Sequence, residues 1–368
     1  MSLSPLFVAR SFADLPGWGD DDHLAAFAAF RRSAFHVLTK PYRSGSLGVD
    51  FDAFAEAYAE ARFVSPANRS QARAFFERHF TPVHIRAEHG GAGLVTGFYE
   101  PEVEASPIRT DRFSVPLLSR PVDLVDIDDA NRPRGMDPYL AFARQTPDGP
   151  VEYPDRGEIE RGALDGKGLE IAWLAEKVDA FFIHVQGAAR LAMTDGRLRR
   201  VTYAAKSGQR FTGPGKILSE IGEIPLEKVT MQSIRAWFKA HPDRIDEILW
   251  QNRSYIFFRE ADVEDAALGP IAAAKVPLTP GRSIAVDRLL HTFGTPFHID
   301  APSLTAFDAK PFRRLMIAQD TGSAITGPAR GDLFAGSGDA AGEIAGVVRH
   351  AADFYALIPR ALVPDANR

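Results

Sequence analysis

Apolar residues recur at helical spacing in the N-terminal part of the chain. Residues 23–38 place Phe27 and Phe30 on one side of such a pattern, and residues 51–63 and 71–80 repeat it. Side chains three or four positions apart lie on the same face of an α-helix. The pattern therefore predicts three amphipathic helices, and we expect their aromatic stripes to pack in a core.

In the middle of the chain the spacing between apolar residues shortens, and segments typical of strands are mixed with segments typical of helices. In residues 84–106 apolar and polar positions alternate, and the segment contains a Gly-Gly pair, which predicts strands joined by a tight turn. Residues 179–208 are typical of a hairpin, with two apolar strands around a Thr-Asp-Gly turn. Helices are predicted within residues 215–224 and 230–252, and a further strand over residues 254–260.

The C-terminal part holds short apolar runs separated by proline and glycine, which is typical of a small β-barrel. The strands predicted here are residues 283–287, 296–300, 314–320, 323–327, 347–350 and 353–359. Helices followed by a mixed region and a strand-rich tail favour an α+β or mainly β protein with helical decoration. The sequence contains neither a Walker loop nor a GxGxxG motif between a strand and a helix, so it gives no support for nucleotide binding.

Composition narrows the function classes further. The 368 residues suffice for two domains, and a formal net charge of -5 leaves no cationic excess for binding nucleic acid. The chain has no cysteine, and His184, His291 and His298 are far apart, so we expect no metal site and no cofactor. No stretch approaches the roughly 20 apolar residues that span a bilayer.

Candidate chemistry concentrates in QDTGSAITGPARGDLFAGSGDAAG, residues 319–342. Its turn formers predict loops at the mouth of a β structure, and carboxylates on such loops serve in glycosidic bond cleavage. Asp332 precedes Leu and Phe, and a partly apolar cleft would raise its pKa and suit a general acid. Asp320 could polarise a neighbour. For both aspartates a turn-capping role is the alternative.

Three other positions carry candidate side chains. Asp339 is interpreted as a helix N-cap. Asp287 ends a predicted strand and could face the same mouth, or cap the turn that follows. Residues 96–102 combine a hydroxyl, aromatic rings and carboxylates, as carbohydrate sites do, although aromatic residues in strands more often pack in a core.

Six segments, in order, resemble the membrane-bound lytic murein transglycosylase A (MltA) family across residues 94–362. These segments are TGFYEPEVEAS, AFFIHVQGAARL, SIRAWFKAHPD, NRSYIFFRE, VPLTPGRSIAVDRLLHTFGTPFHID and QDTGSAITGPARGDLFAGSGDAAG. The last is similar to the three-aspartate (3D) motif of that family. One segment would be weak evidence, but six segments in the family's order make the resemblance specific.

The resemblance implies a mainly β fold with helical decoration. A double-psi β-barrel domain would comprise residues 1–100 and 250–368, and a second β-rich domain would be inserted as residues 101–249. A groove between the domains would hold a peptidoglycan glycan strand as the partner. The implied reaction cleaves the bond between N-acetylmuramic acid (MurNAc) and N-acetylglucosamine (GlcNAc) without water, leaving 1,6-anhydromuramoyl ends.

One carboxyl group suffices for this reaction, because the sugar's own C6 hydroxyl is the tethered nucleophile. The carboxyl group protonates the leaving oxygen and then, as a carboxylate, accepts the proton of that hydroxyl. By resemblance, Asp332 is this acid and base, and Asp320 is its catalytic support. The substrate-binding residues implied are Thr96, Gly97, Tyr99, Gln186, Gly187, Tyr255, Phe258 and Asp287. For Tyr255 and Phe258, core packing is the alternative.

Two other functions stay open: a glycan-binding protein without turnover, and a glycoside hydrolase with a second carboxylate across the cleft from Asp332. The family acts in the periplasm and is often lipid-anchored through an N-terminal cysteine. This chain has no cysteine, and its start does not have the pattern of a signal peptide. The residues by themselves leave two alternatives, a cytoplasmic protein or one whose leader has been removed. Because of the resemblance we expect the second: a periplasmic, outer-membrane-associated protein whose leader or anchor is absent from this chain, with no membrane contact from the chain itself.

Overall fold

The computed structural model describes residues 2–87, 90–261 and 263–363. The chain divides into two compact units, of which unit 1 combines Met1–Tyr99 with Val263–Arg368 and unit 2 is Glu100–Asp262.

The second boundary lies further along the chain than the predicted one, after residue 249. Strand β12 (Ile256–Glu260) pairs with β11 (Leu198–Lys206) in antiparallel register, from Val201 opposite Glu260 onward. Because these backbone hydrogen bonds tie β12 to the sheet of unit 2, the inserted unit extends past the helices that precede this strand.

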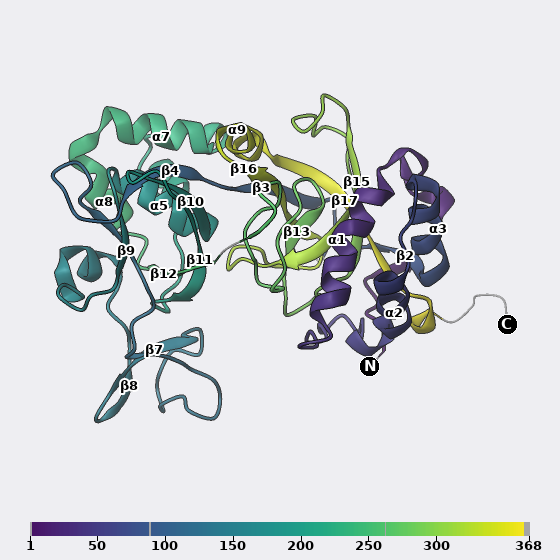
Figure 1. Cartoon of the computed structure of the whole chain (residues 1–368), viewed down its shortest axis with the longest axis horizontal. Coiled ribbons are helices and arrows are strands. Elements are labelled where there is room, and N and C mark those ends of the chain that lie inside the picture. Colours follow the sequence, from purple (N-terminus) through teal and green to yellow (C-terminus); the bar gives the residue numbers. More distant parts are fainter. Residues whose placement is uncertain (1, 88–89, 262, 364–368) are drawn as a thin grey trace. The chain divides into compact units, whose positions relative to one another are not determined.

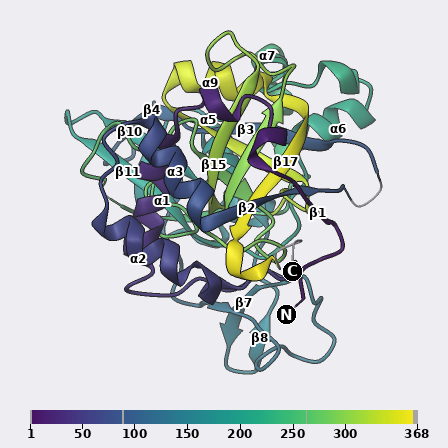
Figure 2. The same ribbon diagram turned by 90° about the vertical axis from the view of Figure 1, so that its right-hand side faces the viewer.

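A layer of helices covers one side of unit 1 (Figures 1 and 2). It consists of α1 (His23–His36), α2 (Ala55–Phe63) and α3 (Arg69–His79), with the 3-10 turn η3 (Phe51–Phe54) before α2. These elements confirm the three helices predicted from the apolar spacing.

The aromatic residues of this layer form a buried cluster, as predicted from the sequence, together with Phe80 at the start of the strand that follows α3. The ring centroid of Phe30 lies 5.2 Å from that of Tyr58 and 5.8 Å from those of Phe76 and Phe80. All four side chains are buried. Edge-on and offset ring pairs of this kind add to the free energy gained by burial.

The sheet of unit 1 runs in the order β1-β2-β17-β14-β15-β13-β16-β3, and β17 also pairs with β3. The strands are β1 (Phe7–Ala9), β2 (Phe80–Ile85), β3 (Gly93–Glu100), β13 (Ser283–Val286), β14 (Pro296–Ala301), β15 (Phe312–Asp320), β16 (Arg330–Ser337) and β17 (Arg349–Pro359). The pairing of β17 with β3 closes a ring of six strands, β17-β14-β15-β13-β16-β3. Unit 1 is therefore built around a closed barrel.

Four details of the C-terminal prediction are wrong. Asp339, predicted as an N-cap, is the first residue of a helix whose N-cap is Gly338. Residues 323–327 lie in the turn region between β15 and β16, and residues 347–350 contain the end of α9 (Asp339–Val347) and the start of β17. Asp332 lies inside β16 and not on a loop. The strand was missed because it is buried on both faces: Leu333 and Phe334 belong to different core clusters, so no alternation marks it.

Unit 2 contains a six-stranded sheet, β12-β11-β10-β4-β9-β5, and a three-stranded sheet, β6-β7-β8. Its remaining strands are β4 (Glu102–Ser106), β5 (Val115–Leu118), β6 (Leu124–Asp126), β7 (Phe142–Thr146), β8 (Gly149–Val151), β9 (Glu170–Leu174) and β10 (Ala188–Met193). Its helices are α4 (Arg156–Glu158), α5 (Lys177–Gln186), α6 (Pro214–Glu220), α7 (Met231–Ala240) and α8 (Ile245–Leu249).

The predicted hairpin is confirmed, because β10 and β11 pair in antiparallel register and flank the Thr-Asp-Gly turn. The first eight residues of the predicted range, 179–186, instead belong to α5. This helix packs Ile183 into one core cluster and Phe181 and Phe182 into another, so it is apolar on both sides. An apolar run of this length shows no helical period and cannot be distinguished from a strand.

The helix predicted at residue 230 is confirmed. Thr230 is the N-cap of α7, and its side chain accepts a hydrogen bond from the backbone N–H of Ser233 at 3.0 Å. Pro242 begins the short 3-10 turn that separates α7 from α8. None of the helices in the described parts of the chain has the length and apolarity to cross a bilayer.

Candidate functional site

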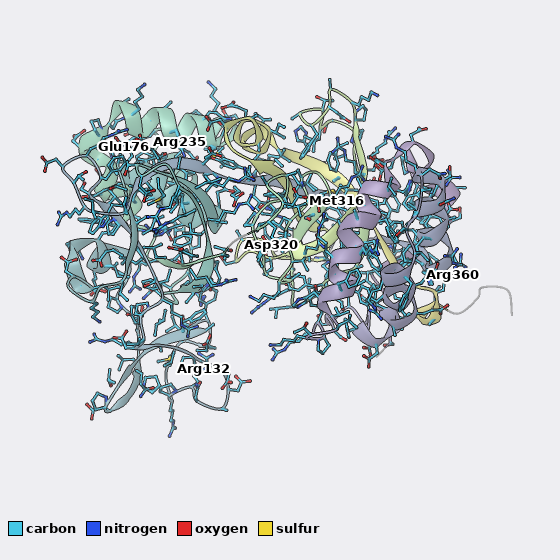
Figure 3. All side chains as sticks on the ribbon, in the orientation of Figure 1. Arg132, Glu176, Arg235, Met316, Asp320 and Arg360 are labelled. Carbon is cyan, nitrogen blue, oxygen red and sulfur yellow. The ribbon has the colours of Figure 1, made fainter. Side chains whose placement is uncertain are left out.

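Asp320 and Asp332 are brought together by the register of the barrel. Ala285 of β13 is the partner of Asp320 on β15 on one side, and of Asp332 on β16 on the other. Partners across neighbouring strands direct their side chains to the same face, so both carboxyl groups lie on one face, roughly 10 Å apart between Cα atoms across two strand spacings. Both side chains are half-buried (Figure 3 labels Asp320).

Asp332 is held by a side chain of the adjacent strand β3. The hydroxyl of Thr96 donates a hydrogen bond to Asp332 Oδ1 at 2.5 Å, and Arg330 Nη2 donates to Thr96 Oγ1 at 2.8 Å. Burial raises the pKa of the Asp332 carboxyl above its usual value, although the Thr96 hydrogen bond and the charge of Arg330 oppose this rise. A raised pKa lets the carboxyl group keep its proton closer to neutral pH, as a general acid requires.

Asp320 is anchored by the backbone around it. Its Oδ1 accepts a hydrogen bond from the N–H of Ala273 at 3.1 Å, and the N–H of Thr321 contributes another. Burial raises the pKa of Asp320 to about 6, and the neighbouring charge of Asp332 adds to the rise. Two nearby carboxyl groups ionise one after the other, because the first negative charge disfavours the second.

The raised pKa of Asp320 predicts a pH-dependent stability. A folded-state pKa of about 6 exceeds the usual value of 3.8, so the folded protein holds this proton more tightly, and the stability it contributes is lost as pH rises toward 6. In Asp320→Asn no ionisation occurs, and the amide oxygen can still accept from Ala273. We expect the variant to be more stable than the wild type at about pH 7.5, by up to about 3 kcal/mol.

Urea unfolding of both proteins at about pH 4 and about pH 7.5 measures this effect. The gain of Asp320→Asn should be larger at the higher pH. Asp20→Asn, which changes an exposed carboxylate of unit 1, is the matched control and should show no such growth. An equal difference at both pH values would contradict the prediction.

Gly97 and Tyr99 of the predicted site lie where β3 meets α9. A Cβ atom on Gly97 would lie 2.9 Å from Ala345 Cα, and a Cβ atom on Gly342 would lie 2.9 Å from the ring of Tyr99. Only glycine permits such an approach of helix and strand without displacement. These residues therefore position β3, the strand that carries Thr96.

Asp287 lies at the turn that follows β13. Its two carboxylate oxygens accept hydrogen bonds from the backbone N–H groups of Leu289 and Gly327, both at 3.0 Å. This geometry matches the turn-capping alternative and also ties the turn to the segment that leads into β16.

Four predicted residues belong to unit 2. Gln186 is the last residue of α5, and Gly187 is its C-cap with φ 75°, a left-handed conformation that favours glycine. Tyr255 and Phe258 are buried, with 3% and 0% of their surface exposed. The ring of Tyr255 lies edge-on to His184 at 4.5 Å. Both rings pack in the core, as the alternative stated, and neither presents an open face to a sugar in this structure.

Arg330 and Ala273 belong to the site although neither was predicted from the sequence. Arg330 precedes Asp332 by two positions, and in a strand this spacing places both side chains on one face. That signal becomes visible only once β16 is known to be a strand. Nothing in the sequence marks Ala273, because its contribution is a backbone N–H group.

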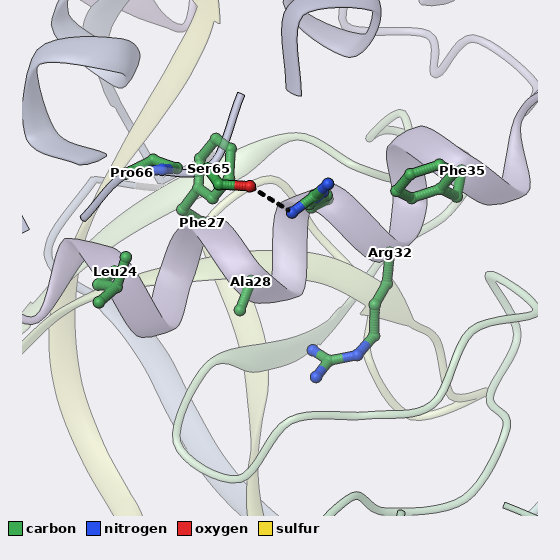
Figure 4. A pocket seen from close by; sticks show the side chains of 8 residues that line it. Leu24, Phe27, Ala28, Arg32, Phe35, Ser65 and Pro66 are labelled. Carbon is green, nitrogen blue, oxygen red and sulfur yellow. Dashed lines mark hydrogen bonds between the residues drawn. The ribbon is translucent and has the colours of Figure 1, made fainter. Parts of the chain in front are cut away.

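Among the residues that the structure describes, neither a metal-binding cluster nor the hollow beside α1 adds to this site. Within the described residue ranges, no three His, Asp or Glu side chains are grouped so that they could hold a metal ion. A hollow of about 360 Å³ lies along α1, where Arg31 Nη1 donates to Ser65 Oγ at 3.3 Å (Figure 4). Its lining consists of Leu24, Phe27, Ala28, Arg31, Arg32, Phe35, Ser65 and Pro66. It includes no carboxylate and none of the predicted site residues.

Fold and site together define a mainly β protein whose barrel carries a pair of carboxyl groups suited to proton transfer. Residues 94–259 match the family model of the MltA specific insert domain, and residues 282–358 match that of the 3D domain. The chain belongs to the membrane-bound lytic murein transglycosylase A family.

Solved structures agree with this assignment. The crystal structure of a membrane-bound lytic murein transglycosylase from Agrobacterium tumefaciens is 52% identical, with a TM-score of 0.91, over 96% of this chain and 98% of that chain. The monoclinic crystal form of MltA from Neisseria gonorrhoeae is 31% identical, with a TM-score of 0.78, over 96% and 92% of the two chains.

Among curated relatives, the membrane-bound lytic murein transglycosylase A of Escherichia coli K12 is 31% identical over 270 residues, which are 72% of this chain and 65% of that protein. The protein of the same name from Vibrio cholerae is 34% identical over 203 residues, 54% of each chain. The matched part thus spans between half and two thirds of the length of these relatives.

Proposed function

We propose that the protein is a peptidoglycan lytic transglycosylase that cleaves the bond between MurNAc and GlcNAc and leaves 1,6-anhydroMurNAc ends. Membership of a family whose relatives are named lytic murein transglycosylases supports the class of reaction. The observation that carries the mechanism is Asp332, a half-buried carboxyl group with a raised pKa and one oxygen held by Thr96.

In the first step, Asp332 donates its proton to the glycosidic oxygen. The bond between C1 of MurNAc and that oxygen then breaks, and GlcNAc leaves with a new hydroxyl group. The positive charge that develops on the muramic ring is stabilised by the carboxylate that remains.

In the second step, the C6 hydroxyl of the same MurNAc attacks C1, and Asp332 accepts the hydroxyl proton. The carboxyl group is thereby restored and no water is consumed. Because the nucleophile is tethered to the ring it attacks, the protein need not supply one.

Asp320 supports this chemistry from β15, on the same face of the barrel as Asp332 and on the other side of β13. Its hydrogen bonds with the backbone at Ala273 and Thr321 hold it in place, and below about pH 6 it is largely neutral, since its pKa is raised to about 6. A neutral Asp320 does not repel the negative charge that forms on Asp332 during the reaction. We propose that it orients the sugar through a hydrogen bond.

The proposal extends to the fold and the setting. The six-stranded ring would have double-psi connectivity. The residues proposed to bind the glycan include Thr96 and Gly97 in unit 1, and Gln186 and Gly187 in unit 2. The partner would be the glycan strands of peptidoglycan. A periplasmic, outer-membrane-associated location fits relatives that are named membrane-bound.

Digestion of purified peptidoglycan sacculi, followed by mass spectrometry of the soluble products, tests the proposal. We expect muramic ends that lack the elements of one water molecule relative to reducing ends. Reducing ends would instead identify a hydrolase, for which Asp320 would be the second carboxylate. Bound but uncleaved glycan would identify a binding protein, and either result rejects the proposed function.

A further inference from the structure

A hydrogen-bonded chain of three side chains ends on Asp332. Arg330 Nη2 donates to Thr96 Oγ1 at 2.8 Å, and Thr96 Oγ1 donates to Asp332 Oδ1 at 2.5 Å. The guanidinium group has donors only, whereas a hydroxyl group has one donor and accepting lone pairs. Arg330 therefore occupies an accepting site of Thr96, and the single hydroxyl proton is left to point at Asp332.

We propose that Arg330 is a positioning residue that acts through Thr96 to fix which oxygen of Asp332 carries the transferable proton. Oδ1 accepts from the Thr96 hydroxyl, so the proton of the neutral acid resides on Oδ2. This inference rests on the proposed role of Asp332 and deepens it, because both proton transfers would then use one and the same oxygen.

The barrel holds this chain in place. Arg330 and Asp332 are two positions apart on β16, so their side chains lie on the same face of the strand. Thr96 lies on the adjacent strand β3. Arg330 is half-buried, and its Nη1 donates to the backbone carbonyl of Gly331. The guanidinium group is thus held at two points, which limits the orientations it can adopt.

The charged groups around these three side chains determine the pKa of Asp332. The positive charge of Arg330, on the same strand, interacts with Asp332. Asp320 on β15 interacts with the negative charge of Asp332. Arg349 on β17 interacts with Arg330 as a like charge. Arg330 and the Thr96 hydroxyl both stabilise the ionised carboxylate, so they oppose the rise that burial imposes on the pKa of Asp332. Removing either should raise that pKa further.

Paired variants at each position separate the proposed role from simple packing. Thr96→Val keeps the shape but loses the hydroxyl, whereas Thr96→Ser keeps the hydroxyl. Arg330→Met loses the charge and the donors, whereas Arg330→Lys keeps a charge and a donor. We expect Thr96→Val and Arg330→Met to lower kcat by about tenfold to a hundredfold with little change in KM, and the Ser and Lys variants to recover most of it.

The pH profile of kcat gives a readout that a purely structural role would not move. Activity falls at high pH as the acid loses its proton, so a higher pKa of Asp332 should shift this limb to higher pH in Thr96→Val and Arg330→Met. In the double variant the losses should not add, because Arg330 acts through Thr96. Circular dichroism of each variant verifies that it is folded.

Wild-type kcat and an unmoved pH profile in Arg330→Met would overturn the proposal, as would fully additive losses in the double variant. If Arg330→Met does not fold, Arg330→Lys against Thr96→Val still gives the comparison. The wild-type protein distinguishes the two levels of inference. If it forms no anhydro products, the proposed function fails; if it forms them and Arg330→Met is unaffected, only the positioning role fails.

Discussion

Asp332→Asn is expected to abolish the formation of anhydromuramoyl products, with a loss in kcat toward the upper end of the range of about 10²–10⁴-fold that general acid–base catalysis contributes. The effect should be large because one carboxyl group serves both proton transfers. An amide can neither protonate the leaving oxygen nor accept the proton of the C6 hydroxyl. The amide oxygen can still accept from Thr96, so the fold and the binding of glycan should be retained.

Release of soluble muropeptides from sacculi measures this loss, and co-sedimentation with sacculi measures binding. Asp339→Asn is the matched control, since it changes an exposed carboxylate at the start of α9 within the same sequence segment. We expect this control to retain nearly full activity. Substantial turnover by Asp332→Asn would remove Asp332 from the mechanism and direct attention to Asp320.

Asp21→Ala is expected to lower the free energy of unfolding by about 3–5 kcal/mol. Asp21 and Arg282 form a buried ion pair, in which Arg282 Nη2 lies 2.8 Å from Asp21 Oδ1 and the side chains are 8% and 3% exposed. Asp21 Oδ2 also accepts from the backbone N–H of Leu315 at 2.6 Å. Without the carboxylate, a guanidinium charge and an amide would stay buried without their partner.

Urea denaturation of each variant measures the loss. Asp308→Ala is the matched control, because Asp308 is largely exposed in its pair with Arg314 and should cost about 1 kcal/mol or less. Replacing both members, as in Asp21→Ala with Arg282→Met, should recover part of the loss by removing the uncompensated charge. A small loss in Asp21→Ala, similar to that of the control, would contradict the prediction.

The same ion pair predicts a sensitivity to acid. Burial alone would raise the pKa of Asp21, but the charge and hydrogen bonds of Arg282 and the N–H of Leu315 outweigh it and hold the pKa below its usual value. A depressed folded-state pKa contributes stability above the unfolded-state pKa of about 3.9, and that stability is lost as pH falls. The acid limb of the stability profile should therefore flatten in Asp21→Ala.

Local patterns predicted those parts of the fold in which one face of an element is buried. The helices α1, α2 and α3 and the cap at Thr230 follow from such patterns. The pattern failed where an element is covered on both sides. Helix α5 contacts two core clusters and β16 lies between two others, so neither shows a period that distinguishes a helix from a strand.

By itself, the sequence determined the family, through six ordered segments, and it singled out Asp332 and Asp320 as its chemical candidates. Only the tertiary structure decided what surrounds them: the shared partner Ala285 on β13, and the chain from Arg330 through Thr96 to Asp332. The physical reason is that strand pairing brings together residues more than two hundred positions apart, such as Thr96 and Asp332. The spacing of residues within a short segment does not indicate which distant strands will pair.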